Sequence, residues 1–80
     1  MENEKLLTFE FMAADEMLVI NLNNEGICSL INELNILINS RREQDHIHLM
    51  TDSWGGKELS EIPQCPKSIL INHVKIIKWK

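Results

Sequence analysis

The sequence predicts an α+β fold of two layers, in which one amphipathic helix covers one face of a four-stranded, mostly antiparallel sheet. Three observations support this prediction. Strand-like segments at residues 6–13 and 17–22 are separated only by Ala14-Asp15-Glu16, a spacing typical of an antiparallel hairpin. Apolar residues at the period of a helix follow the hairpin. Two more strand-like segments, near residues 46–51 and 69–79, complete the order ββαββ.

The hairpin is predicted from its alternating side chains. Residues of one face are apolar in both strands, and those of the other face are more polar. The predicted apolar face consists of Leu7, Phe9, Phe11 and Ala13 in the first strand and Leu18, Ile20 and Leu22 in the second. Glu10 belongs to the other face, where we expect it to meet solvent.

The helix is the best-supported element. Asn23 or Asn24 can accept hydrogen bonds from the free amides of the first turn, and Arg41 and Arg42 are expected in the last turn, where cations are favoured. Apolar residues recur between them at helical spacing. These are Ile27, Leu30, Ile31, Leu34, Leu37 and Ile38.

One helix can cover only one face of such a sheet, so the other face is left to solvent or to a partner. Eighty residues form a single domain, residues 1–80, close to the lower size limit for independent folding. The open face is expected to carry Glu10, His46, His48, Lys75 and Trp79, among others. This asymmetry is the central structural prediction.

The charge of the chain limits its partners. Its formal net charge is −4, and residues 1–61 contain all twelve acidic residues, whereas residues 62–80 contain four lysines and no acid. An acidic body argues against nucleic-acid binding and is compatible with a basic protein partner. No apolar run approaches the ~20 residues that a membrane span needs. Two cysteines make no disulfide framework, and the N-terminus shows no leader, so we expect a cytoplasmic protein.

His46 and His48 alternate on a strand and should project from the same face. Such a pair can ligate zinc if further ligands converge on it. The simpler interpretation is that both occupy the solvated side of the strand, and we favour it, so no metal or cofactor is expected. The residues available as further ligands are His73, Asp45, Asp52 and Cys65.

The loop that begins with Trp54-Gly55-Gly56 has two interpretations. Glycines permit unusual backbone and close approach of another chain, and a neighbouring tryptophan can anchor a partner. Alternatively, Trp54 folds back and closes the open end of the core. The segment Glu58-Leu59-Ser60-Glu61 is expected as a short helical turn or an exposed acidic edge. Nothing near His46 and His48 pairs a nucleophile with a base, so we do not expect them to act as a proton shuttle.

These residues resemble a known family. The run His46-Ile47-His48-Leu49-Met50-Thr51, followed by Trp54-Gly55-Gly56 and Glu58-Leu59-Ser60, resembles the bacterial immunity protein 32 family, and Ile71-Asn72-His73-Val74-Lys75-Ile76 is similar to its terminal strand. The resemblance implies a cytoplasmic protein that is not an enzyme and that neutralises a cognate polymorphic toxin by direct binding. The predicted contacts are His46, His48, Trp54, Gly55, Gly56, Lys57 and Glu58.

Two other hypotheses remain open. One is a small metal-binding protein that uses His46, His48 and His73. The other is a homodimer whose sheets or edge strands pair, so that oligomerisation is the structural role. Neither excludes the first, because an immunity protein can also dimerise.

Overall fold

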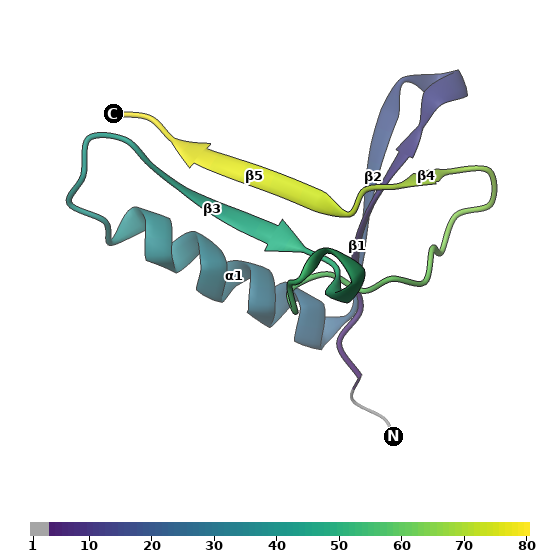
Figure 1. Cartoon of the computed structure of the whole chain (residues 1–80), viewed down its shortest axis with the longest axis horizontal. Helices are drawn as coiled ribbons and strands as arrows, with labels where there is room; N and C mark the ends of the chain where they lie inside the picture. Colours follow the sequence, from purple (N-terminus) through teal and green to yellow (C-terminus); the bar gives the residue numbers. More distant parts are fainter. Residues whose placement is uncertain (1–3) are drawn as a thin grey trace.

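The computed structural model describes residues 4–80 and contains five strands, one α-helix and two short 3-10 helices in that range (Figure 1). The order is ββαβββ, with the 3-10 helices after the first and third strands. The elements are β1 (Leu7–Met12), η1 (Ala13–Asp15), β2 (Met17–Leu22), α1 (Asn24–Ile38), β3 (Asp45–Met50), η2 (Asp52–Trp54), β4 (Ile69–Leu70) and β5 (His73–Lys78).

The strands form two sheets, so the prediction of a single four-stranded sheet is wrong. One sheet has the order β2-β1-β4 and the other pairs β3 with β5, all antiparallel. The C-terminal segment is divided because it changes partner within two residues. Ile71 N donates to Phe9 O at 2.8 Å, and Thr51 N donates to Asn72 O at 3.0 Å. The segment expected as one strand therefore joins both sheets.

The β1–β2 hairpin agrees with the prediction. Its register pairs Leu7 with Leu22 and Met12 with Met17, without a bulge. The turn closes through η1, and Glu16 adopts a left-handed conformation with φ 51°. The hairpin stands at an angle to the β3–β5 layer and projects beyond it (Figure 1).

Glu10 is fully buried, which corrects its expected place on a solvated face. The cause is the segment after residue 61, which folds over this side of β1 and turns its amides toward the carboxylate. The donors are Thr8 Oγ1 (2.6 Å), Asn21 Nδ2 (3.0 Å), Gln64 N (2.9 Å), Cys65 N (2.9 Å) and Ser68 Oγ (2.8 Å). Burial alone would raise the pKa of Glu10, but the hydrogen bonds outweigh it and lower the pKa to about 2.

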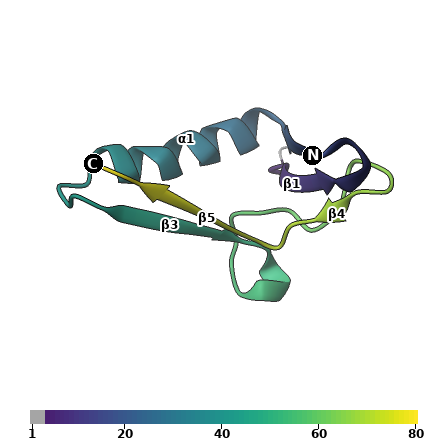
Figure 2. The ribbon, with the colours of Figure 1, turned by 90° about the horizontal axis from the view of Figure 1, so that it is seen from above.

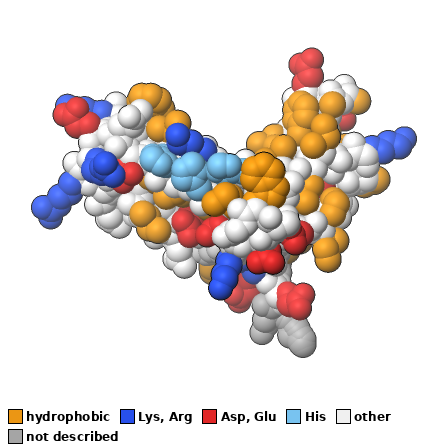
Figure 3. Space-filling model, viewed as in Figure 1, with side chains coloured by type: hydrophobic (Ala, Val, Ile, Leu, Met, Phe, Trp, Pro, Cys, Tyr) orange, Lys and Arg blue, Asp and Glu red, His pale blue; other side chains and the backbone are white. Residues whose placement is uncertain are grey.

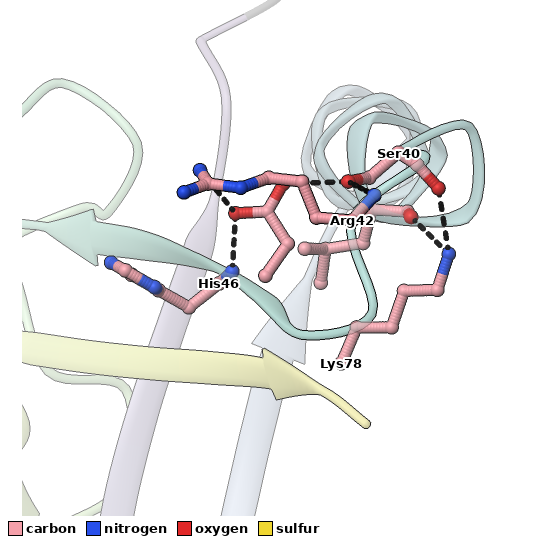
Figure 4. A network of polar contacts seen from close by, with 6 residues as sticks. Ser40, Arg42, His46 and Lys78 are labelled. Carbon is pink, nitrogen blue, oxygen red and sulfur yellow. Dashed lines mark hydrogen bonds and ion pairs between the residues drawn. The ribbon is translucent and has the colours of Figure 1, made fainter. Parts of the chain in front are cut away.

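Helix α1 begins as expected and ends earlier. Asn23 is the N-cap, and its Oδ1 accepts from Gly26 N at 2.9 Å. The helix ends at Ile38, so Arg41 and Arg42 lie beyond its last turn, contrary to the prediction. The cation at this end comes instead from β5: Lys78 Nζ donates to the carbonyls of Leu37 (2.9 Å) and Ser40 (3.2 Å), as Figure 4 shows.

The connection from α1 to β3 is held by Asp45. Ser40 Oγ donates to Asp45 Oδ2 at 2.8 Å, His46 N donates to Asp45 Oδ1 at 2.8 Å, and Arg42 lies 3.7 Å from the same carboxylate (Figure 4). The hydrogen bond from Ser40 is the main reason why the pKa of Asp45 is lowered. These contacts fix the start of β3 relative to the helix end.

The buried core lies where α1, β1 and β3 meet. Its members are Leu7, Phe9, Leu37, Ile47, Leu49 and Leu59, with Leu22, Leu30, Ile71, Val74 and Ile76 packed against them. Helix α1 lies along one side of the β3–β5 layer, and η2 lies on the other (Figure 2). The helix covers β3 and β5, but the outer part of the hairpin extends past it. Leu18 and Ile20 of its apolar face therefore remain 53% and 42% exposed.

Candidate functional site: a histidine and tryptophan surface

The surface of interest is the outer face of the β3–β5 sheet. In this pair Ile47 faces Ile76 and Leu49 faces Val74, and these side chains turn toward the core. Because side chains alternate along a strand, the residues between them point outward. His46, His48, His73 and Lys75 are accordingly exposed, as is Trp79 after the end of β5. The prediction of an open face is confirmed for these positions.

Three imidazoles and one indole form a continuous line on this face, which we call the His–Trp row (His46, His48, His73 and Trp54). The ring centroids are 4.9 Å apart from His46 to His48, 4.9 Å from His48 to His73 and 6.1 Å from His73 to Trp54. The histidines cross the centre of the face in Figure 3, next to apolar atoms. Residues from β3, η2 and β5 thus build one surface.

A hydrogen bond links two of these rings. His48 Nδ1 and His73 Nε2 are 2.7 Å apart, so one nitrogen carries the hydrogen and the other accepts it. Partial burial is the first cause that lowers the pKa of His48, and the neighbouring charge of His73 is the second. The neutral form of His48 is therefore favoured. A neutral imidazole costs less to desolvate against a partner than a charged one.

The loop holds Trp54 outward. The indole is 57% exposed, so it does not close the core. Gly55 follows with φ +93°, a backbone conformation that L side chains rarely adopt. Gly56 is buried, and a Cβ there would lie 2.6 Å from Met50 O. The first glycine turns the chain, and the second lets it return against β3.

Two carboxylates fix this loop. Residues 58–61 do not form the helical turn that was one alternative, whereas Glu61 is exposed, in line with the other. Glu58 Oε1 accepts from Met50 N at 3.0 Å, and Glu61 Oε2 accepts from Ser53 N at 2.8 Å. The hydrogen bond from Met50 N is the first cause of the lowered pKa of Glu58. The pKa of Glu61 is lowered first by the side chain of Ser53 and then by its backbone amide. Between them, Leu59 is buried and bridges to Thr51.

The structure therefore divides the predicted contact residues into two groups. His46, His48, Trp54 and Gly55 are exposed, and the three side chains share the row. Gly56 is buried and Glu58 is half-buried, so their main role is to shape the loop. Lys57 is exposed, and its carbonyl accepts from Lys5 Nζ at 2.9 Å.

His73 is the member that the predicted contact set lacks. It pairs with Met50 across β3 and β5, which places it beside His48 and Trp54. The only indication in the sequence was that His73 is a polar residue in a final strand with alternating polar and apolar side chains. To include His73 among the predicted contacts, one would have to know that this strand pairs with β3 and in which register.

The geometry gives the metal hypothesis no support. In residues 4–80, no group of three or more histidine, cysteine or acidic side chains is arranged to hold a metal ion. His48 and His73 bond to each other instead of converging on a common point. Asp45 is engaged at the helix end, and Cys65 lies near Asn21 in the other sheet.

Fold and surface together define the class of the chain: a small α+β protein with an exposed aromatic surface on a two-stranded sheet. In comparisons with known proteins, no family model, curated protein or solved structure matches it. Along residues 4–80, the one α-helix falls short of the length and apolar character needed to cross a membrane.

Proposed function

We propose that this chain is a non-enzymatic protein-binding module that neutralises a toxin by direct contact through the His–Trp row. The observation that carries the proposal is the exposed Trp54, held beside three imidazoles on the open face of the β3–β5 sheet. The resemblance to the immunity protein 32 family supports a toxin as the partner and the cytoplasm as the place of action.

The row has the composition of a contact surface. Tryptophan is enriched among the residues that contribute most to protein interfaces, because it buries a large area at little conformational cost. The loop is already fixed by Glu58, Glu61 and the hydrogen bond from Thr51 Oγ1 to Asn72 Oδ1 at 2.8 Å. Little flexibility is then lost when a partner binds, which favours affinity.

Charge supports a basic partner. The chain carries −4 overall. Two exposed acidic residues lie near Trp54: Asp52 precedes it by two positions, and Glu61 accepts a hydrogen bond from the neighbouring Ser53 N. An aromatic row with acidic residues near it suits a partner whose contact surface is apolar at the centre and basic around it. Such charges mainly accelerate association, so binding should weaken as salt rises.

The test is a binding measurement with the toxin domain encoded beside this gene. We expect micromolar or tighter affinity, and a 10- to 100-fold weaker complex for Trp54→Ala, since an interface anchor contributes roughly 1.4–3 kcal/mol. Ile36→Ala is the matched control, because Ile36 is 56% exposed, about as much as Trp54, but belongs to α1, on the other side of the β3–β5 layer from η2. Absence of binding by the wild type, or equal affinity of Trp54→Ala, would contradict the proposal.

A further inference from the structure

Four aliphatic side chains of α1 remain exposed although they belong to its apolar stripe. We call them the helix seam: Ile27 (40% exposed), Ile31 (50%), Leu34 (42%) and Ile38 (72%). In the same helix Leu37 is buried and Leu30 packs on the core. The stripe predicted to cover the sheet is therefore wider than the sheet uses, and four of its six residues face outward.

The spacing of the seam is that of helices that pack against each other. Its residues are separated by four, three and four positions, which is the a/d pattern of a coiled coil. At 100° per residue, the seam lies on a flank of α1, next to the positions of Leu30 and Leu37. A second helix laid along this flank would insert side chains between these four.

The size of the molecule also indicates a missing neighbour. The chain exposes 5779 Å², whereas a compact monomer of its mass exposes about 5,000 Å². Its radius of gyration is 13.4 Å, against about 11.6 Å for a compact domain of 80 residues. The excess area, roughly 800 Å², includes the projecting β1–β2 hairpin as well as the helix seam, and it is comparable to what one partner buries in a stable interface.

A second copy of this chain fits the seam best. The solvent side of the seam is bordered by Asn24, Cys28 and Asn35, none of which is charged. A neutral, apolar strip offers no attraction to a charged partner, and it lets two chains of charge −4 meet without like charges at the contact. The spacing of four, three and four is also the same in both directions, so the strip is complementary to itself.

We propose that two copies of this chain dimerise through the helix seam, with the two α1 helices antiparallel about a two-fold axis. Ile27 then lies opposite the partner's Ile38, and Ile31 opposite the partner's Leu34.

The dimer leaves the His–Trp row accessible. Helix α1 and η2 lie on opposite sides of the β3–β5 layer (Figure 2), so contact through α1 does not cover Trp54. Each dimer would present two rows. The inference does not depend on the proposed toxin binding, because it concerns another surface and its test needs no toxin.

The first experiment measures mass in solution. Light scattering of the wild-type chain at tens of micromolar should give about twice 9.3 kDa. Ile31→Lys should give the monomer mass, because a charge is buried at the centre of the seam. Ile36→Lys is the matched control: Ile36 is 56% exposed on the same helix but on the opposite side, so the dimer should persist.

These variants keep the proposal falsifiable. Ile31 and Ile36 are about equally exposed, so neither change disturbs the monomer core, and circular dichroism should show the same helix content for both. A monomeric wild type would overturn the proposal. A dimer that persists in Ile31→Lys would do the same, and would point to the free edge of β2 instead.

The second experiment tests the orientation with a thiol cross-linker of ~8 Å in a Cys65→Ser background. In the antiparallel dimer the two Cys28 residues are separated by about 13 Å along the axis and should not react. Asn35→Cys places a thiol near the partner's Cys28, so this variant should cross-link efficiently between residues 28 and 35. Cross-linking between the two native Cys28 residues would show a parallel pair and overturn the antiparallel arrangement.

Discussion

At the scale of single residues, Glu10 shows how a buried carboxylate is accommodated without a cation. All of its described donors are uncharged, and three of them come from residues 64–68, more than fifty positions away in the sequence. Hydrogen bonds to an ionised acceptor are roughly twice as strong as those between neutral groups. The carboxylate therefore anchors the loop between β3 and β4 to β1.

Replacing this charge should destabilise the whole chain. We expect Glu10→Gln to cost about 2–3 kcal/mol, because the amide nitrogen would face the amides of Gln64 and Cys65 and leave donors unpaired. Thermal unfolding should show a decrease of roughly 10–20 °C in Tm. Asp15→Asn, an exposed change in the hairpin turn, is the control and should leave Tm within about 2 °C. Equal stability of both variants would contradict this role.

The same group defines a dependence on pH. The folded pKa of Glu10 is about 2, below its ordinary value of 4.5. Its contribution to stability is therefore complete above pH 4.5 and is lost as the pH falls toward 2. Urea unfolding between pH 6 and pH 3 should show this loss in the wild type and a smaller one in Glu10→Gln.

The linked imidazoles give a second titration. Removing the neighbouring charge in His73→Ala should raise the pKa of His48 toward its ordinary value, but not fully, since burial is the larger cause. Lys75→Met, which removes a weaker neighbour, should raise it less. Proton resonances of the imidazole measured from pH 4 to 8 report both shifts. A pKa of His48 that stays unchanged in His73→Ala would contradict the coupling.

The direction of the pKa shift of His48 determines how the stability of the fold depends on pH. Because the folded pKa of His48 is lowered, the unfolded chain binds the proton more readily. The associated stability is complete above the unfolded pKa of about 6.5 and declines as the pH falls through the lowered value. Mild acid should therefore weaken the sheet that carries the row.

At the scale of elements, the two glycines after Trp54 have separable roles. Gly55 needs its positive φ, but a Cβ at this position would meet no other atom within 4 Å, so Asn, which tolerates this conformation, should cost below about 1 kcal/mol. Gly56→Ala should cost more, about 2–4 kcal/mol, because its Cβ would overlap Met50 and Glu58. Unfolding free energies in urea test the order, and a smaller loss for Gly56→Ala would contradict it.

Elements held by neighbouring residues were predictable, and those held by distant residues were not. The hairpin register and the Asn23 cap depend on local alternation and a local hydrogen bond. The helix end depends on Lys78, forty residues away, which replaces the arginines expected there. Likewise, the segment expected as the last strand is divided because Ile71 and Asn72 form hydrogen bonds with different sheets. Their partners lie far away in the sequence, so no local pattern predicts the division.

The site was predictable to a similar extent. Strand alternation placed His46 and His48 on an open face, and the glycines after Trp54 indicated a loop with an outward tryptophan as one alternative. The burial of Glu10 was not predictable, because a carboxylate on an alternating strand is normally solvated. The structure shows that a segment much later in the sequence covers Glu10 and that five donors meet its carboxylate.

At the scale of the whole molecule, the apolar stripe of α1 is divided between the core and the surface. Periodicity identifies six apolar positions but does not distinguish those that pack on the sheet from those left exposed. The structure makes this division: Leu30 and Leu37 face the core and the other four form the helix seam. An 80-residue chain has a small core, so the proposed interface between copies would add a large share of its total stability.

The coupling between folding and dimerisation gives the last prediction. If only the folded chain dimerises, mass action stabilises the folded state more at higher concentration. The Tm of the wild type should then rise by several degrees between about 1 and 100 μM, since 1 kcal/mol corresponds to roughly 4–8 °C in a domain of this size. Ile36→Lys should show the same rise, whereas Ile31→Lys should unfold at one temperature throughout. Scanning calorimetry at three concentrations measures this, and a wild-type Tm independent of concentration would contradict a dimer that contributes to stability.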